Sequence, residues 1–487
     1  MSTAIEHAPK RRDAWCFILL LLLTLAVASW IWGLVCLFPS IEWNNVRLRP
    51  SFLLATGNTI YEGATGGPIN TWMYGPLLPI LLLPATWATS TASALLVAAF
   101  INAALVLATP ALACGLWPHP STARERWLVF VSSILATPPV FFLFLSADSL
   151  AIVFSLLGIL ALHKAKGKGP GWLWIAAAMG VAASASKQTA VAVLAAQVIH
   201  IGIVEGRKSA IRHFARCGVL AIGAGCLIGL FFGLEATWLK LVLIPSRLPF
   251  SHDISGVSYR LAPYLLAYAG MLLLIWRRAR KNDQCMMLVL LTGLCTLPLG
   301  LAATLRDGGA INSLHGYSLM LPFCLLELLA WLKIVLPKIT LSLPRPLWFA
   351  IAIIAVALAA SPRWTETARL PHAPMVAAIH EAETLARRFP GEIWFPWSPL
   401  ISFYSEGRHY HDEDGLYVRQ VSGVLPKREL AYGYLPPKWR VTAMRFKGGD
   451  KMNWNVAIAM QRTGPITMET FGNWALIISQ PPSPPSH

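Results

Sequence analysis

Long apolar runs recur along most of this chain and are separated by short polar segments. A helix needs about 20 apolar residues to cross a bilayer, and several of the runs are shorter than that. The pattern predicts an all-α polytopic membrane domain of about 11–12 spans. The runs lie at 15–38, 92–116, 127–145, 149–163, 171–186, 188–204, 217–238, 261–276, 284–304, 315–332 and 346–361.

The segment 76–90 is also apolar, but it is short and contains three prolines, Pro76, Pro79 and Pro84. It either crosses the membrane or dips into it and returns. The choice matters because a crossing at this point would reverse the side of the loops that follow.

Basic residues concentrate in short loops between the runs, which the positive-inside rule places in the cytoplasm. The N-terminal segment and five basic loops all fit that side if 76–90 does not cross. We therefore expect a cytoplasmic N-terminus and an extracytoplasmic chain after 361. The stretches 39–75, 146–148, 184–189, 239–260 and 305–314 would also face outside.

Composition agrees with a membrane protein, since 56% of the 487 residues are hydrophobic and only 13% are charged. The net charge of +17 could indicate nucleic-acid binding, but most of the excess lies in the loops that the positive-inside rule explains. We therefore expect no nucleic-acid partner. The eight cysteines lie in or beside apolar runs, with no disulfide framework and no metal spacing.

The chain after 361 is more polar and long enough for a core of its own. Helical periodicity over Met375–Phe389 and strand-like segments at 392–395, 453–460 and 473–479 predict a small α/β or α+β domain. We assign 1–361 to the membrane domain, 362–480 to an extracytoplasmic domain, and the proline-rich 481–487 to a disordered tail.

Lys187 is the one charged residue between Trp172 and Val204. An ammonium at the centre of a spanning helix costs about 2.5–3.5 kcal/mol, which two shorter helices meeting at a polar turn would largely avoid. Lys187 is then either a snorkelling interfacial lysine or a group with a fixed partner such as a phosphate. Gln188 adds hydrogen-bonding capacity beside it.

Three carboxylates on the predicted outer side are candidates for chemistry. Glu42 and Glu62 lie in the first outer loop, where an acid is either a solvated interfacial group or a general base for a hydroxyl acceptor. Asp148 opens an apolar run, which is the position of a helix N-cap, and it could face a site as well.

The segment 306–317 joins two runs on the same outer side and contains Arg306, Asn312 and His315. An arginine there is either an ordinary interfacial residue or a clamp for a phosphate. Glu327 lies inside an apolar run, as a protonated or paired carboxyl or as part of a proton or ion relay. No phosphate-binding glycine motif and no zinc spacing occur in a suitable context.

The order of these features resembles the GT-C superfamily of membrane glycosyltransferases, which includes the protein mannosyltransferases and the aminoarabinose transferase of lipid A. The likeness covers about residues 10–360. The family usually has an aspartate in the first outer loop, where this chain offers Glu42. The similar features are Ile41-Glu42-Trp43-Asn44, Tyr74-Gly75-Pro76-Leu77, Ala147-Asp148, Lys187-Gln188-Thr189-Ala190 and Gly308-Gly309 with Asn312 and Tyr317.

The resemblance implies an enzyme of the bacterial inner membrane that moves a sugar from a polyprenyl phosphate carrier to an extracytoplasmic acceptor. The acceptor would be a lipid, a glycan or a protein. Glu42 and Asp148 would be the catalytic carboxylates, with the first-loop residue Glu42 as the base of an inverting displacement. A divalent cation stays open as a cofactor, although no metal-binding residue is predicted. The donor-binding residues would be Lys187, Gln188, Arg306, Asn312, His315, Tyr74 and Glu62.

Two other functions stay open from the residues alone. A transporter or flippase of a lipid-linked anion would use the same phosphate-binding charges without a base, and Glu327 fits it somewhat better. A non-catalytic assembly protein would bind its partner through residues 362–487.

Overall fold

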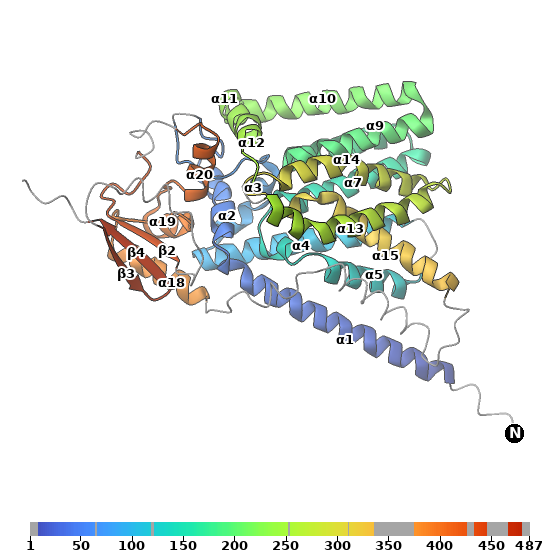
Figure 1. Ribbon diagram of the computed structural model, residues 1–487, viewed down its shortest axis with the longest axis horizontal. Coiled ribbons are helices and arrows are strands. Elements are labelled where there is room, and N and C mark those ends of the chain that lie inside the picture. The colour runs from blue at the N-terminus through green and yellow to red at the C-terminus, as the bar shows by residue number, and fades with distance from the viewer. Residues whose placement is uncertain are drawn as a thin grey trace, which may run out of the picture.

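The computed structural model describes residues 8–63, 66–117, 121–251, 254–309, 311–335, 375–425, 433–445 and 466–479. Long helices lie side by side in a bundle, and a small domain containing a sheet packs against one end of it (Figure 1). The N-terminal end of α1 (Ala8–Leu37) lies at the opposite end of the bundle from the small domain (Figure 1).

Most of the bundle consists of helices that follow the predicted runs. After α1, the helices of the bundle in chain order are α2 (Glu42–Ala55), α3 (Leu77–Leu81), α4 (Thr91–Leu116), α5 (Ala123–Ala136), α6 (Val140–Leu143), α7 (Ala147–Lys168), α8 (Gly171–Ser186), α9 (Val191–Glu205), α10 (Arg207–Phe232), α11 (Leu234–Trp238), α12 (Ile244–Arg247), α13 (Ile254–Ala279), α14 (Gln284–Thr304) and α15 (His315–Val335). Short 3-10 or π turns connect them: η1 (Phe38–Ser40), η2 (Leu83–Trp87), η3 (Gln188–Ala190), η4 (Leu239–Leu243) and η5 (Ile311–Ser313).

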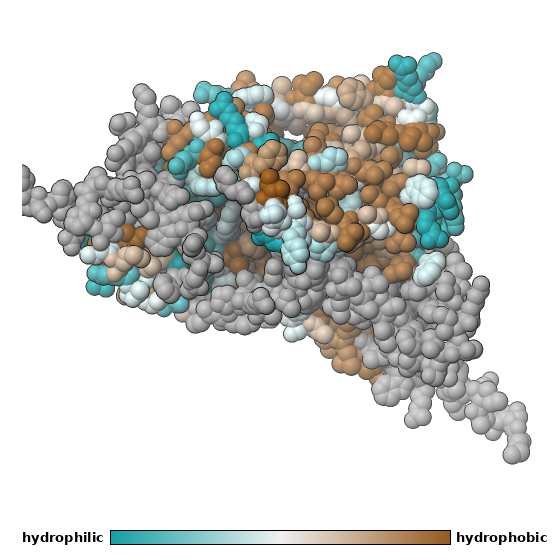
Figure 2. All heavy atoms as spheres, viewed as in Figure 1, coloured by the Kyte–Doolittle hydropathy of each residue, from teal (hydrophilic) through white to brown (hydrophobic). Residues whose placement is uncertain are grey.

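Within the described residues, seven helices are long and apolar enough to cross a membrane, and α8 is a shorter apolar helix. Figure 2 shows hydrophobic side chains over the middle of the bundle and hydrophilic ones towards its ends. The outward surface of α10 is lined by large exposed apolar side chains, as a helix facing lipid requires. The seven are Leu20–Ser40, Thr91–Leu116, Ala147–Ala165, Gln188–Glu205, Arg207–Phe232, Ile254–Ala279 and Gln284–Thr304.

The predicted fold class is confirmed, and the helices correct the prediction in two places. The run 127–145 is not one helix, because Pro138 and Pro139 separate α5 from α6. The stretch 39–75 contains α2, which the sequence did not predict. The segment 76–90 forms only α3 and η2, each of five residues and too short to cross. The run 346–361 lies outside the described residues.

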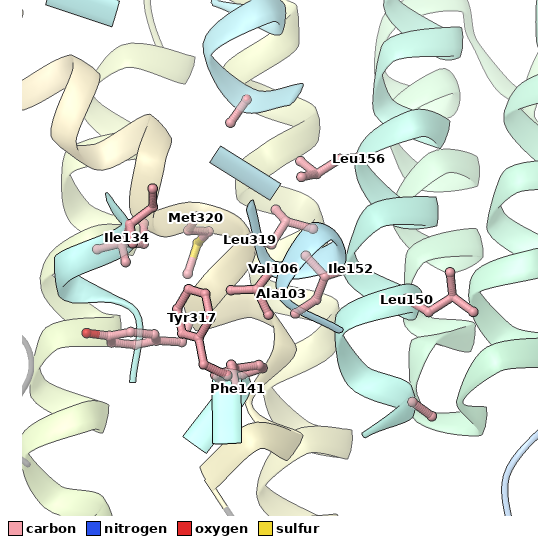
Figure 3. Close-up of a cluster of buried hydrophobic side chains, with 14 of the residues drawn as sticks. Ala103, Val106, Ile134, Phe141, Leu150, Ile152, Leu156, Tyr317, Leu319 and Met320 are labelled. Carbon is pink, nitrogen blue, oxygen red and sulfur yellow. The ribbon is translucent and has the colours of Figure 1, made fainter. Parts of the chain in front are cut away.

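The core of the bundle forms where α4, α5, α6, α7 and α15 converge, as Figure 3 shows. Small residues on α4, such as Ala103, let larger side chains of α7 and α15 pack closely. The cluster includes Ala103, Val106, Ile134, Phe141, Ile152, Leu156, Tyr317, Leu319 and Met320.

The C-terminal domain contains a mixed four-stranded sheet with the order β1-β2-β4-β3. Strand β1 pairs parallel with β2, with Ile393 opposite Val441, and β4 pairs antiparallel with both β2 and β3. The predicted strand at 453–460 and the proline-rich tail lie outside the described residues. The elements are α18 (Met375–Arg388), β1 (Ile393–Trp394), α19 (Pro399–Glu406), α20 (Glu413–Val421), β2 (Val441–Arg445), β3 (Ile466–Phe471) and β4 (Trp474–Ser479).

Buried ion pairs attach this domain to the bundle. Arg49 Nη1 of α2 lies 2.9 Å from Asp412 Oδ2, at the start of α20, and both side chains are fully buried. Glu62 Oε1 lies 2.5 Å from Lys240 Nζ and 3.0 Å from Arg419 Nη2, again in the interior.

Backbone contacts complete the attachment. Ile69 N donates to His411 Nδ1 at 2.7 Å, and Leu400 N donates to Asn45 Oδ1 at 2.9 Å. Gly415 is required here, because a Cβ at this position would lie 2.6 Å from the backbone carbon of Asn70. The two domains therefore form one polar, closely packed interface.

We predict that Arg49→Met destabilises the protein by about 3–5 kcal/mol, because it leaves Asp412 buried without its cation. Adding Asp412→Leu should recover most of the loss, since an apolar pair of similar volume is often neutral. Thermal unfolding in detergent micelles measures both. The surface pair Arg440–Glu392, whose side chains are 51% and 23% exposed, is the control and should change stability by about 1 kcal/mol or less. An additive loss in the Arg49/Asp412 double variant would contradict the role given to this pair.

Candidate functional site

A cavity of about 780 Å³ lies between the end of the bundle and the C-terminal domain. Its size is typical of pockets for small organic ligands. Residues from six separate parts of the bundle and from the C-terminal domain line it. The polar and aromatic ones used below are Glu42, Trp43, Arg47, Tyr74, Asp148, Lys187, Gln188, Arg306, Asp307, Asn312, Ser313, Trp397, Glu413, Asp414 and Tyr417.

A buried ion pair between Lys187 and Asp148 lies in the wall of this cavity. Lys187 Nζ is 2.6 Å from Asp148 Oδ1, and the two side chains are only 5% and 2% exposed. His315 Nε2 also bonds to Asp148 Oδ1, and Asn312 Nδ2 donates to Asp148 Oδ2 at 2.6 Å. Four residues that the sequence singled out separately are thus in direct contact.

The local backbone explains how Lys187 reaches this position. Lys187 follows the last residue of α8 and precedes η3, in an extended conformation with φ −145°. The expected polar turn between two apolar helices is confirmed. Gly75 allows the loop between α2 and α3 to touch this turn, because a Cβ there would lie 1.5 Å from Ala185 O.

Asp148 does not cap its helix as the sequence suggested. Helix α7 begins at Ala147, so its N-cap residue is Ser146, and Asp148 lies in the first turn. Its carboxylate instead accepts bonds from the three side chains described above. An acid in a first helical turn is also favoured by the helix dipole.

The ring of Tyr74 lies between two cations. Lys187 Nζ is 5.3 Å from the ring centroid and Arg47 Cζ is 5.1 Å from it. Burial alone would raise the pKa of Tyr74, but Arg47 and Lys187 outweigh it and lower the pKa below its ordinary value. The ring thus holds two positive groups close together on the cavity wall.

Lys187 keeps capacity for a ligand. An ammonium has three N–H donors, and the described residues accept two of them, through Asp148 and through Ser313 Oγ at 3.3 Å. The third donor is available to an anion in the cavity. Arg47 lies on the same Tyr74 ring, so two cations are close together at this part of the cavity wall, which we call the positive corner.

Arg306 lines the same cavity but is held by backbone. Its Nη1 donates to Ser246 O at 3.1 Å and to Leu248 O, and its guanidinium lies 5.4 Å from the Phe250 ring centroid. These contacts join the segment after α12 to the segment after α14. The other N–H groups of the guanidinium fork remain for a ligand.

Glu42 begins α2 and faces the cavity as a buried carboxylate. Three further acids share the lining: Asp307, Glu413 and Asp414. Thr71 donates to Asp414, and Tyr417 OH donates to Asp307. Burial and the bond to Asp307 raise the pKa of Tyr417 to about 12, so its phenol stays protonated.

Three candidates have other surroundings than the sequence suggested. Gln188 lines the cavity, but its Nε2 donates to Met73 O at 2.7 Å and Leu241 O at 3.2 Å. Glu62 is not among the lining residues and belongs to the domain interface. Glu327 lies 3.9 Å from Arg278 Nε and does not line the cavity either.

Sequence reasoning did not identify Arg47, Trp397, Glu413 and Asp414. Arg47 follows Trp43 by four residues, so both occupy one face of α2 once that helix is recognised, and the guanidinium lies 5.0 Å from the Trp43 ring. The other three belong to a domain whose docking no sequence pattern indicates. In the part of the chain that the structure describes, no cluster of three His, Cys, Asp or Glu side chains is placed to hold a metal ion.

Comparison with known proteins identifies the fold. No family model and no curated protein matches the chain. The crystal structure of ArnT from Cupriavidus metallidurans bound to undecaprenyl phosphate matches with a TM-score of 0.54 and 12% identity, over 93% of this chain and 97% of that one. Apo ArnT from the same organism matches with a TM-score of 0.52 and 12% identity, over 96% and 98% of the two chains. The chain therefore has the ArnT fold over nearly its whole length, which confirms the predicted GT-C resemblance for the fold.

We predict that Asp148→Ala destabilises the protein by about 3–5 kcal/mol, because Lys187 would be buried without an anion. The double variant Asp148→Leu/Lys187→Met should lose much less. Thermal unfolding in detergent micelles is the measurement. Equal losses of stability in Asp148→Ala and in the double variant would show that the fold does not depend on this ion pair.

Proposed function

We propose that the protein is a glycosyltransferase of the bacterial inner membrane that moves a sugar from a polyprenyl phosphate carrier to an extracytoplasmic acceptor. The observation that carries the proposal is the buried pair of Lys187 and Asp148, with the partly buried Arg47 on the same Tyr74 ring as Lys187, in a cavity between apolar helices and a polar domain. A lipid phosphate needs such a combination, with cations for its head group and an apolar route for its chain. The ArnT structure with undecaprenyl phosphate, which shares the fold, adds support.

The donor phosphate would bind at the positive corner formed by Lys187 and Arg47, and Arg306 also lines the cavity. Charge-assisted bonds from an ammonium and a guanidinium are the strong interactions available to a phosphate. The prenyl chain would leave the cavity past three apolar lining residues near the end of α14, namely Leu299, Ala302 and Ala303, and then enter the lipid.

The reaction would be a single displacement at the anomeric carbon. A hydroxyl oxygen of the acceptor forms the new bond, and the bond between the anomeric carbon and the phosphate oxygen breaks. The electron pair leaves with the polyprenyl phosphate, whose added negative charge Lys187 and Arg47 stabilise. The acceptor proton passes to a carboxylate.

Glu42 is the carboxylate we assign as that base. Asp148 already accepts bonds from Lys187, His315 and Asn312, and protonating it would weaken all three. Glu42 lines the cavity from the start of α2, and protonating it does not require those three bonds to Asp148 to weaken. Asp148 would instead keep Lys187 in place, as a positioning residue.

A transporter remains the second candidate because the same cations would bind a lipid-linked anion. Its distinctive feature was Glu327, but this carboxylate lies near Arg278, away from the cavity lining. Movement of undecaprenyl phosphate across proteoliposomes without sugar transfer would favour the transporter.

Glu42→Gln should lower kcat by about 10²–10⁴, the usual contribution of a general base, while undecaprenyl phosphate binding is unchanged. Sugar release from labelled undecaprenyl-phosphoryl sugars in detergent micelles measures kcat. The exposed Glu469 on β3, replaced in Glu469→Gln, is the matched control and should keep full activity. Undiminished turnover in Glu42→Gln would remove Glu42 from the mechanism.

Undecaprenyl phosphate at 100 times its Kd should stabilise the native protein by about 2.7 kcal/mol, because it binds the folded state only. In Lys187→Met the shift should largely disappear, since the ammonium is lost from the phosphate corner. Thermal unfolding with and without the lipid, compared with undecaprenol as the uncharged control, makes the measurement. A shift that undecaprenol reproduces in full would show that the chain, not the phosphate, is recognised.

A further inference from the structure

The two sides of the cavity both carry acids and aromatic rings, but they differ in their cations. Among the described lining residues, all the cations, Arg47, Lys187 and Arg306, belong to the bundle. The C-terminal domain supplies aromatic, acidic and apolar side chains and no cation. We call this side the C-terminal wall, and it consists of Trp397, Glu413, Asp414, Tyr417 and Val418.

Trp397 of the C-terminal wall faces Trp43 of the bundle. Their ring centroids are 6.0 Å apart, with an interplanar angle of 37°. Both indoles line the cavity and are only partly buried, so each leaves ring surface towards the space between the domains. Arg47 lies 5.0 Å from the Trp43 ring, which connects this aromatic pair to the positive corner.

The carboxylates beside Trp397 decide which ligand suits this wall. Glu413 and Asp414 are 1% and 6% exposed and both line the cavity. A carboxylate only accepts hydrogen bonds, so its complement is a ligand rich in hydroxyl donors. A hydrocarbon chain has no group that can donate to a carboxylate. A sugar has both required features: C–H faces that pack on aromatic rings and hydroxyls that donate to carboxylates.

The C-terminal wall is held in place before any ligand binds. Asp412, directly before Glu413, accepts from Gly415 N at 2.7 Å and pairs with Arg49. Glu413 N donates to Pro396 O at 3.0 Å, which fixes α20 against the segment that contains Trp397. Tyr417 OH donates to Asp307 of the bundle. Such preorganisation favours selective binding, because little ordering remains to be done.

We infer that Trp43 and the C-terminal wall form the subsite that recognises the sugar of the lipid-linked donor, with Trp397 packing on the sugar ring and Glu413 accepting from its hydroxyls. The inference rests on the proposed function and deepens it. It assigns to the C-terminal domain the selection of the sugar, while the bundle binds the phosphate and the prenyl chain.

The experiment compares the affinity of undecaprenyl phosphate with that of undecaprenyl phosphate carrying glucose, mannose or arabinose. Microscale thermophoresis in detergent micelles measures each Kd. In the wild type, at least one sugar should tighten binding over the bare lipid phosphate. Trp397→Ala should abolish most of that gain, which raises the Kd of the sugar-bearing lipid about tenfold, and should leave the Kd of undecaprenyl phosphate unchanged.

Further variants separate recognition from folding. Trp397→Phe keeps an aromatic ring and should retain part of the gain, and Glu413→Gln should change which sugar binds best. Tyr434, 39% exposed in the same domain and outside this lining, gives the control Tyr434→Ala, which should behave as wild type. The same thermal unfolding midpoint in Trp397→Phe and wild type confirms that the domain is intact.

The outcomes distinguish the inference from the function on which it rests. If wild type does not bind undecaprenyl phosphate, the proposed function fails. If it binds the lipid phosphate but none of the sugars adds affinity, or if the gain survives in Trp397→Ala, the sugar subsite is wrong and the phosphate site stands. A loss of affinity for undecaprenyl phosphate itself in Trp397→Ala would also overturn the inference.

Discussion

The ion pair between Lys187 and Asp148 is the constraint on which the end of the bundle next to the C-terminal domain depends. A charge inside a membrane protein is tolerated only with a partner, and an ammonium without one would cost several kcal/mol. To pair Lys187, the chain must bring the first turn of α7 to the break between α8 and η3. Asn312 and His315 complete the cluster, so η5 and α15 must meet there as well. One buried charge thus fixes the meeting point of four segments and places the cavity beside it.

A second set of buried charges makes the C-terminal domain part of the same site. Arg49 on α2 pairs with Asp412, and Glu62 in the loop after α2 pairs with Arg419. Such pairs contribute little net stability but strongly disfavour arrangements in which one partner is left alone. The domain therefore has one favoured position on the bundle. In that position Glu413, next to Asp412 in sequence, lines the cavity.

The sequence predicted those features that hydrophobic periodicity and isolated charges encode. The helices 171–186 and 284–304 match to the residue, and the polar turn at Lys187 follows from the cost of burying its charge. Helix α2 was missed because it lies across the bundle end and buries polar residues such as Arg49 and Asn45, so it has no clear apolar face. The local sequence around Asp148 indicates a helix start and therefore an N-cap. It does not reveal the actual partner, Lys187, which is 39 positions away. Glu413 and Trp397 had no signal at all, since their role arises only when the two domains dock.

The hydrogen bonds that Asp148 already accepts also bear on which carboxylate acts as the base. A base must give up its bonds as it takes a proton, and Asp148 would have to weaken its bonds to Lys187, His315 and Asn312 in that step. The same step would leave Lys187 without its counter-charge just as a phosphate beside it gains negative charge. Lys187 would then bind the leaving group more tightly, and product release would slow. Keeping Asp148 ionised throughout avoids this coupling. An acid other than Asp148, such as Glu42 at the start of α2, can take the proton while the pair of Asp148 and Lys187 stays ionised, which is why we assign the proton transfer there.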